Sequence, residues 1–170
     1  MKQPSQGFTL LELLVVILLM AMMTTLAIPS FIAFGERNTL SAAVNQLQSS
    51  LAFARNTAIT RRIEVTVCPA DNNRENCTND WENELLVIAG DKRDGLSTED
   101  ILRVFPALNS VDVTYNRRYR AFHFNTLGHI ESYIGSLYIC PHGAEQGSRL
   151  VMSWLGRTRI EEQPYDCSSE

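Results

Sequence analysis

The 170-residue sequence lacks the short motifs on which most enzymes and metalloproteins depend. Its three histidines form neither an HxH nor an HExxH pattern, and Ser153 does not lie in a GxSxG motif. The four cysteines have the spacings CX8C and CX26C, which match no zinc-binding module. The four acids of residues 91–100 do not follow the DxDxDG calcium template and indicate a solvated turn. We therefore predict no enzymatic activity, no metal site and no cofactor.

Lysine is scarce, and the overall charge is small. Arginine outnumbers lysine by 13 to 2, and the formal net charge is −4 at pH 7, so the bulk charge does not indicate nucleic-acid binding. The sequence has neither an internal repeat nor a low-complexity tract. Its 45% hydrophobic and 20% charged residues exclude a disordered chain, and its length is that of one domain.

The apolar residues are concentrated in the first fifth of the sequence. Between Phe8 and Phe34, 21 of 27 residues are apolar, and Glu12 is the only ionisable side chain. A helix of this length spans about 40 Å, which is enough to cross a hydrocarbon core of about 30 Å. The sequence therefore predicts a membrane-spanning helix over residues 8–34, followed by a globular head.

A secretory signal is one explanation of this segment, with Lys2 as its basic region and residues 25–27 as a cleavage site of small residues. Glu12 argues against it, because a carboxylate in lipid costs about 2.5–3.5 kcal/mol. A charge kept at such a position indicates a function. The alternative is a glutamate at the helix end that reaches the headgroups.

The string Gly7-Phe8-Thr9-Leu10-Leu11-Glu12 resembles the type III signal of type IV prepilins and pseudopilins. The resemblance implies a leader over residues 1–7, cleavage between Gly7 and Phe8 by a prepilin peptidase, and N-methylation of Phe8. It also implies that Glu12 pairs with the α-amine of Phe8 on a neighbouring subunit during assembly. Pro29 lies where many pilins have a helix-bending proline.

Beyond Phe34 the apolar pattern becomes one-sided. Six apolar residues are spaced 4, 3, 4, 3 and 4 apart, which predicts one buried stripe on a helix; they are Leu40, Val44, Leu47, Leu51, Ala54 and Ala58. We therefore expect a single helix from Phe8 to about Thr60. Its half over residues 8–34 contacts lipid or other subunits, and its half over residues 35–60 packs on the head.

The rest of the chain, residues 61–170, shows strand patterns separated by turn signals. Candidate strands are residues 63–68, 85–89, 101–105, 111–115, 120–125, 136–140, 149–154 and 157–160. His123 alternates with Phe122 and Phe124, so we expect it to point outward. The predicted fold class is α+β: a long bent N-terminal helix packed on an antiparallel sheet.

Within the pilin superfamily the head resembles the GspH/FimT/FimU group. The similar features are Cys68-Pro69 after the first strand, Trp81 before a short apolar strand, Phe124-Asn125 followed by Gly128, and the closing segments 149–153 and 156–159. The chain departs from the usual pattern after Trp81, where Asn83-Glu84-Leu85 stands in place of a Gly-Trp.

The four cysteines would lie outside the cytoplasmic membrane, where oxidation is the default. Three pairings of four cysteines are possible. Proximity in the sequence favours Cys68–Cys77, and the family pattern favours Cys140–Cys167, which would hold the C-terminal tail.

The closing half of the head is basic. Residues 71–112 hold ten acids and four bases, a net of −6, whereas residues 113–160 hold six arginines and two glutamates, a net of +4. The six are Arg117, Arg118, Arg120, Arg149, Arg157 and Arg159. Arg157 and Arg159 would project from one strand face, and guanidinium groups suit bidentate phosphate contacts. The Gly-Arg-Thr-Arg string resembles one with which FimT-like minor pilins bind DNA. A solvated strand face or a contact between subunits would explain the same residues.

The resemblance implies a minor pilin of a type IV pilus system that primes the pilus or links its tip to the shaft. It would be anchored in the inner membrane with its head in the periplasm until it enters the pilus. Its partners would be other pilins and the prepilin peptidase. The alternatives are a minor pilin that binds double-stranded DNA for natural transformation and a GspH-type pseudopilin of type II secretion.

Overall fold

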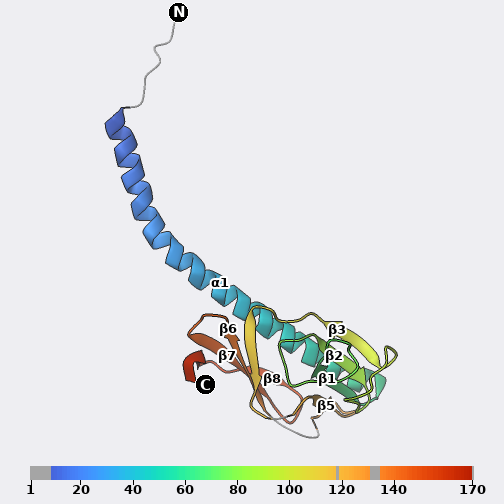
Figure 1. The fold of residues 1–170 in the computed structure, drawn as a ribbon. Coiled ribbons are helices and arrows are strands. Elements are labelled where there is room, and N and C mark those ends of the chain that lie inside the picture. The colour runs from blue at the N-terminus through green and yellow to red at the C-terminus, as the bar shows by residue number, and fades with distance from the viewer. Residues whose placement is uncertain (1–8, 118, 131–134, 170) are drawn as a thin grey trace, which may run out of the picture. The chain divides into compact units, whose positions relative to one another are not determined.

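The computed structural model of the protein describes residues 9–117, 119–130 and 135–169. The chain divides into two compact units, Met1–Arg37 (unit 1) and Asn38–Glu170 (unit 2). Figure 1 shows one helix, two antiparallel sheets and a short C-terminal 3-10 turn. The fold class is therefore α+β, as the sequence predicts.

Helix α1 extends from Leu10 to Arg61 and is continuous through Pro29. Thr9 lies just before its first residue, and the Glu12 backbone N–H donates a hydrogen bond to Thr9 Oγ1 at 3.3 Å. This is the geometry of an N-cap, which satisfies one of the free donors at the start of a helix. The predicted first residue, Phe8, lies outside the described residues.

The part of α1 in unit 2 buries the apolar stripe that its spacing predicts. Leu47, Leu51, Ala54 and Ala58 are at most 1% exposed. The helix ends at Arg61, one residue after the predicted end, and Arg62 follows with a φ of 55°. A residue in this left-handed conformation is a common helix stop, because it turns the chain away from the axis.

The first sheet has the strand order β3-β2-β1-β5, and all of its neighbouring strands are antiparallel. Its strands are β1 (Val65–Pro69), β2 (Leu85–Ala89), β3 (Ile101–Phe105) and β5 (Phe122–Phe124).

The second sheet has the order β4-β6-β7-β8, and β9 also pairs with β7. Its strands are β4 (Val111–Tyr115), β6 (Ser136–Pro141), β7 (Gln146–Met152), β8 (Thr158–Ile160) and β9 (Tyr165–Asp166). A 3-10 turn, η1 (Cys167–Ser169), follows β9.

The first sheet is covered on both faces, which explains why β1 and β2 are almost continuous apolar runs. Val65 and Val87 belong to the main core, together with the buried stripe of α1 and residues of the second sheet. Leu86 and Ile88 belong to a second apolar cluster with Cys68. The alternation of side chains along a strand places these two clusters on opposite faces.

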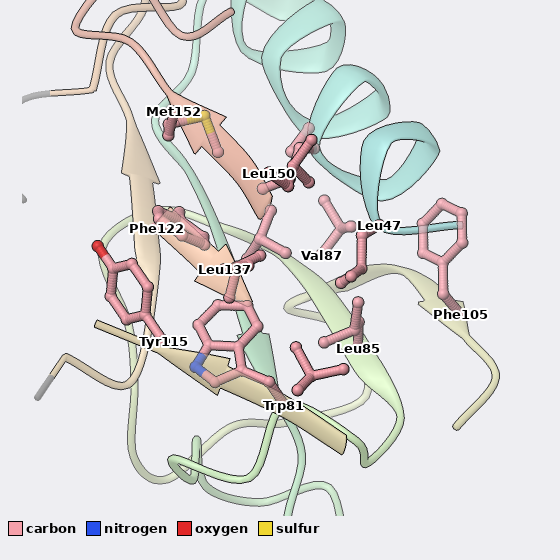
Figure 2. Close-up of a cluster of buried hydrophobic side chains, with 14 of the residues drawn as sticks. Leu47, Trp81, Leu85, Val87, Phe105, Tyr115, Phe122, Leu137, Leu150 and Met152 are labelled. Atoms are coloured by element: carbon pink, nitrogen blue, oxygen red, sulfur yellow. The ribbon is translucent and has the colours of Figure 1, made fainter. Parts of the chain in front are cut away.

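Aromatic side chains fill the centre of the main core (Figure 2). The Trp81 ring lies 5.0 Å from the Phe122 ring and 5.7 Å from the Tyr115 ring, centroid to centroid. Trp81 is 1% exposed, so the segment before β2 is anchored to the core by its largest side chain.

Several predicted strand ends differ from the structure. The predicted strand over residues 120–125 is shortened to β5, and the predicted strand over residues 149–154 ends at Met152 in β7. A turn follows β7, in which Ser153 N donates to Arg157 O at 2.9 Å. Arg157 therefore belongs to this turn and precedes β8. Strand β9, which no pattern in the sequence predicts, has two residues and pairs with Gln146 and Gly147.

Candidate functional site

Every described side chain of α1 from Leu10 to Phe34 is exposed, including Glu12 near its start. By length and composition this helix is able to cross a membrane. Apolar residues cover all its sides, so burial needs lipid or other chains around it. Gly7 and Phe8, the predicted processing residues, lie outside the described residues. The Pro29 backbone is helical, and its side chain is not described.

The arrangement of Glu12 allows two roles. Thr9 and Glu12 stand at the first and fourth positions of a capping box, in which an acid at this place supports the helix start. A negative charge near the N-terminus of a helix is also favourable to the helix dipole. Assembly pairing and helix capping are therefore separable hypotheses for one carboxylate.

Arg157 and Arg159 are exposed at the connection from β7 to β8. Arg159 pairs with Val151, and the two residues that flank Val151, Leu150 and Met152, belong to the core. Alternation therefore places Arg159 on the outer face of the second sheet, whereas Arg157 lies in the turn before β8, so the two do not share a strand as predicted. Neither arginine forms an ion pair with any residue that the structure describes.

The turn that carries Arg157 requires glycine at position 156. Gly156 has a φ of +71°, and its N–H donates to Ser153 O at 2.9 Å. A Cβ at this position would lie 2.2 Å from Gly128 O, which no side chain allows. The turn therefore packs directly on the turn around Gly128.

Arg55 of α1 lies at the same turn as Arg157, although no signal in the sequence singles it out. Its Nε donates to Gly128 O at 3.2 Å. Its Cδ and Nε lie 3.1 and 3.2 Å from the Cβ position at Gly156. The helix thus brings a third arginine to the Arg157 turn.

Two of the other predicted arginines are paired with acids. Arg149 forms an ion pair with Glu161 at 2.9 Å, and its guanidinium lies 5.5 Å from the Tyr138 ring centroid. Arg120 lies 3.6 Å from Asp94. Arg117 is exposed, and Arg118 lies outside the described residues.

The structure contains the disulfides Cys68–Cys77 and Cys140–Cys167. Cys140 lies on β6 and Cys167 follows β9, so the second bond ties the C-terminal segment to the sheet. A Cβ at Gly147 would lie 2.7 Å from Cys167 Sγ and 2.9 Å from Cys140 Sγ. The glycine therefore makes room for the disulfide on β7.

His123 does not point into solvent as predicted, because its ring is covered. It is 6% exposed, and its Nδ1 lies 3.2 Å from Thr66 Oγ1 and 3.6 Å from Asp91 Oδ1. The alternation with Phe122 and Phe124 is correct, but the face it selects is the second buried face of the first sheet. The segment that contains Asp91 closes this face.

Three of the four acids of residues 91–100 form ion pairs, and Asp100 is the least exposed of these three, with 16% of its side chain exposed. Hydrogen bonds from Lys92 and from the backbone and side chain of Ser97 lower the pKa of Asp100 to about 2. Asp91 pairs with Arg93 at 3.2 Å. Among the described residues, no group of three or more potential ligands could hold a metal ion.

The long N-terminal helix and the antiparallel sheets define a pilin-like protein. Residues 43–156 match the family model of the type II transport protein GspH, and residues 2–28 match that of the prokaryotic N-terminal methylation motif. The chain therefore belongs to the GspH family and carries an N-terminal methylation motif. This motif and the apolar helix are consistent with membrane anchoring.

The structure is similar to two crystal structures of the type IV minor pilin FimU of Pseudomonas aeruginosa. One match has 22% identity and a TM-score of 0.64, and covers 79% of this chain and 98% of that chain. The other has 20% identity and a TM-score of 0.61, and covers 75% and 99%. No curated protein matches the sequence. These likenesses show that the fold is that of a pilin.

Proposed function

We propose that the protein is a minor pilin of a type IV pilus system that primes the pilus or links its tip to the shaft. The observation that carries the proposal is the exposed apolar segment of α1 with Glu12 at its start. A segment that is apolar on all sides suits lipid before assembly and a bundle of other pilin helices afterwards.

In this proposal the chain has four parts: a leader over residues 1–7, the membrane and assembly segment 8–34, the packed helix 35–60 and the head 61–170. The prepilin peptidase cuts between Gly7 and Phe8, and Phe8 is N-methylated. The inner membrane then holds the chain with its head in the periplasm until other pilins take it up.

The N-terminal sequence of the mature protein tests the processing step. The proposal expects N-methylphenylalanine at position 8. A mature protein that begins at Ile28 would show cleavage as a secretory signal and would contradict the proposal.

Replacement of Glu12 tests the assembly step. A carboxylate paired with an amine away from water loses about 3–5 kcal/mol when one partner is removed. We expect Glu12→Gln to enter the membrane normally and to be lost from sheared pili. This variant keeps a side chain that suits a capping box but removes the charge.

Glu36→Ala is the matched control, because Glu36 is the next acid along α1 and lies beyond the apolar segment. It should be found in pili at the normal level. Pili that contain Glu12→Gln at the normal level would leave helix capping as the role of Glu12 and overturn the pairing.

DNA binding by the pilus is the second candidate function. The exposure of Arg157 and Arg159, together with Arg55 at the turn that carries Arg157, supports it. Contacts to phosphate by such arginines are independent of sequence and weaken steeply with salt. Double-stranded DNA would then be a partner.

Mobility shifts of double-stranded DNA by the purified full chain in detergent test this candidate. Arg157→Gln and Arg159→Gln should each lower the affinity several-fold. Arg74→Gln is the control, because Arg74 is bound to Glu84 at 2.7 Å. The absence of a shift at low salt would remove DNA binding from the proposal.

A pseudopilin of type II secretion is the third candidate, and the description of the matching family model supports it. Deletion of the gene separates this candidate from the first. Loss of surface pili with normal export of secreted enzymes supports the pilus, and the reverse result supports the secretion system.

A further inference from the structure

Four large apolar side chains are exposed at one end of unit 2, and we call them the apolar end patch. Their exposed fractions are 40% for Ile59, 67% for Leu127, 59% for Trp154 and 45% for Leu155. Among the described residues of unit 2, only Ile160 is a further large apolar side chain with such exposure. A cluster of this kind contributes little to the stability of the head and is typical of a binding surface.

The three segments that carry the patch are in direct contact. A Cβ added at Gly128 would lie 2.7 Å from Ile59 Cδ1, and a Cβ added at Gly156 would lie 2.2 Å from Gly128 O. Ile130 N donates to Trp154 O at 3.1 Å, and the His129 and Trp154 ring centroids are 5.4 Å apart. The patch is therefore one surface built from α1 and two turns.

The two turns are fixed by internal hydrogen bonds. Asn125 Oδ1 accepts bonds from Leu127 N and His129 N, both at 3.0 Å. The other turn is closed by the bonds between Ser153 and Arg157. The patch thus exists before any partner binds, which lowers the entropy lost on binding.

Cationic groups border the patch. Arg157 and Arg159 follow Trp154 and Leu155 closely in the sequence and are exposed, and Arg55 lies at the Gly156 turn. Exposed tryptophan and arginine side chains beside one another are typical of the residues that dominate the energy of protein interfaces. The matching surface must combine apolar side chains with carboxylates.

The α1 residue of the patch, Ile59, lies in the last two turns of this helix. It is about 30 Å along the helix axis from Asn38, where unit 2 begins. The occupant must therefore reach the end of the head that is remote from Asn38.

A second copy of this chain does not fit the patch. A symmetric contact would place Arg157 and Arg159 against their equivalents, which repel. In an asymmetric contact the second copy needs another apolar surface on its head. Apart from the patch, the described residues of unit 2 offer only Ile160. Unit 1 is apolar, but between Phe8 and Phe34 it has one carboxylate, Glu12.

We propose that the apolar end patch is the docking surface for the head of a different pilin-class subunit, one that presents apolar side chains bordered by carboxylates. The pilin class of this partner rests on the proposed function. Trp154 is the central contact, and Arg157 and Arg159 pair with the partner's carboxylates.

Site-specific photocrosslinking in cells that assemble the pilus tests the proposal on the full chain. A benzophenone amino acid replaces Trp154, and a second variant carries it at Asp112, which is exposed on β4. Mass spectrometry should identify, from position 154 and not from position 112, a different protein with its own prepilin signal. Adducts of position 154 with DNA, phospholipid or a second copy, or no adduct, would overturn the proposal.

The amount of the chain in sheared pili gives an independent measure. Trp154→Ala should lower it about tenfold, as expected for a central interface side chain. Ile160→Ala, which removes exposed apolar surface outside the patch, should leave it unchanged. Equal levels of both variants would overturn the role of the patch.

The two proposals fail in different ways. If the unmodified chain is found in pili but position 154 gives no crosslink to another pilin, only the docking surface is wrong. If the unmodified chain is absent from pili, the proposed function fails, and the docking proposal fails with it.

Discussion

The first part of helix α1 is richer in apolar residues than the second, and the two parts bury these residues to opposite extents. All described side chains from Leu10 to Phe34 are exposed, whereas Leu47, Leu51 and Ala58 are at most 1% exposed. The second part has its apolar residues in one stripe, and the two sheets cover that stripe. The first part has them on every side, so no single head could cover it. The arrangement of apolar residues around the helix thus decides which partner each part needs.

Truncation of equivalent leucines in the two parts is the strongest test of this contrast. Leu47→Ala should lower the free energy of unfolding of the head by about 2–5 kcal/mol, because it leaves a cavity in the core. Leu18→Ala, at a position that is 51% exposed, should change it by less than about 0.5 kcal/mol. Denaturant unfolding of the full chain in detergent, followed by near-ultraviolet circular dichroism, measures both. Equal effects would mean that unit 1 also contributes to head stability.

Both disulfides lie in unit 2, and unit 1 contains no such covalent link. Removal of the Cys140–Cys167 disulfide measures how much this link stabilises unit 2. Cys140→Ala with Cys167→Ala should cost about 3–4 kcal/mol, since the bond closes a long loop in the unfolded chain. The cysteines are 27 positions apart. Denaturant unfolding of this variant, compared with that of the unmodified chain before and after reduction, measures the loss of stability. An unchanged midpoint would mean that β9 is held by packing alone.

The charges supply the smallest effect. In unit 2 some acids pair with bases, as Asp100 does with Lys92 at 2.5 Å, whereas Glu12 in unit 1 has no base near it in the sequence. Because the pKa of Asp100 is lowered to about 2, this carboxylate favours the folded state above its ordinary pKa of about 4. Its contribution is lost as the pH falls from about 4 to about 2. A carboxyl NMR titration should give a midpoint near 2 for Asp100 and a higher one in Lys92→Ala, and equal midpoints would contradict the pairing.

The parts of the fold that the sequence predicts well are those in which local pattern and burial agree. The strands β2, β3 and β4 have the predicted bounds, because each is a short apolar or alternating run between turn signals. The stripe of α1 is predicted for the same reason. The two-residue β9 has no such pattern, and it depends on the disulfide at Cys167, which joins it to a distant strand.

The candidate sites were predicted less completely, since they depend on contacts between distant segments. The string at Arg157 and Arg159 is visible in the sequence, but its neighbour Arg55 comes from a helix about 100 residues earlier. Trp154 falls in a predicted strand, and only the turn at Gly156 brings it to the surface. The prediction that His123 points into solvent is wrong, because Thr66 of β1 and the distant segment with Asp91 contact its ring, and the pattern within β5 contains no sign of them.

The absence of a side chain at Gly147 makes the oxidation state of the head part of its packing. The space over this residue is occupied by the sulfurs of Cys140 and Cys167, so reduced thiols that move apart leave β7 with an unfilled hollow. The Cys140–Cys167 bond therefore serves β7 as a filling side chain would, in addition to holding the C-terminal segment.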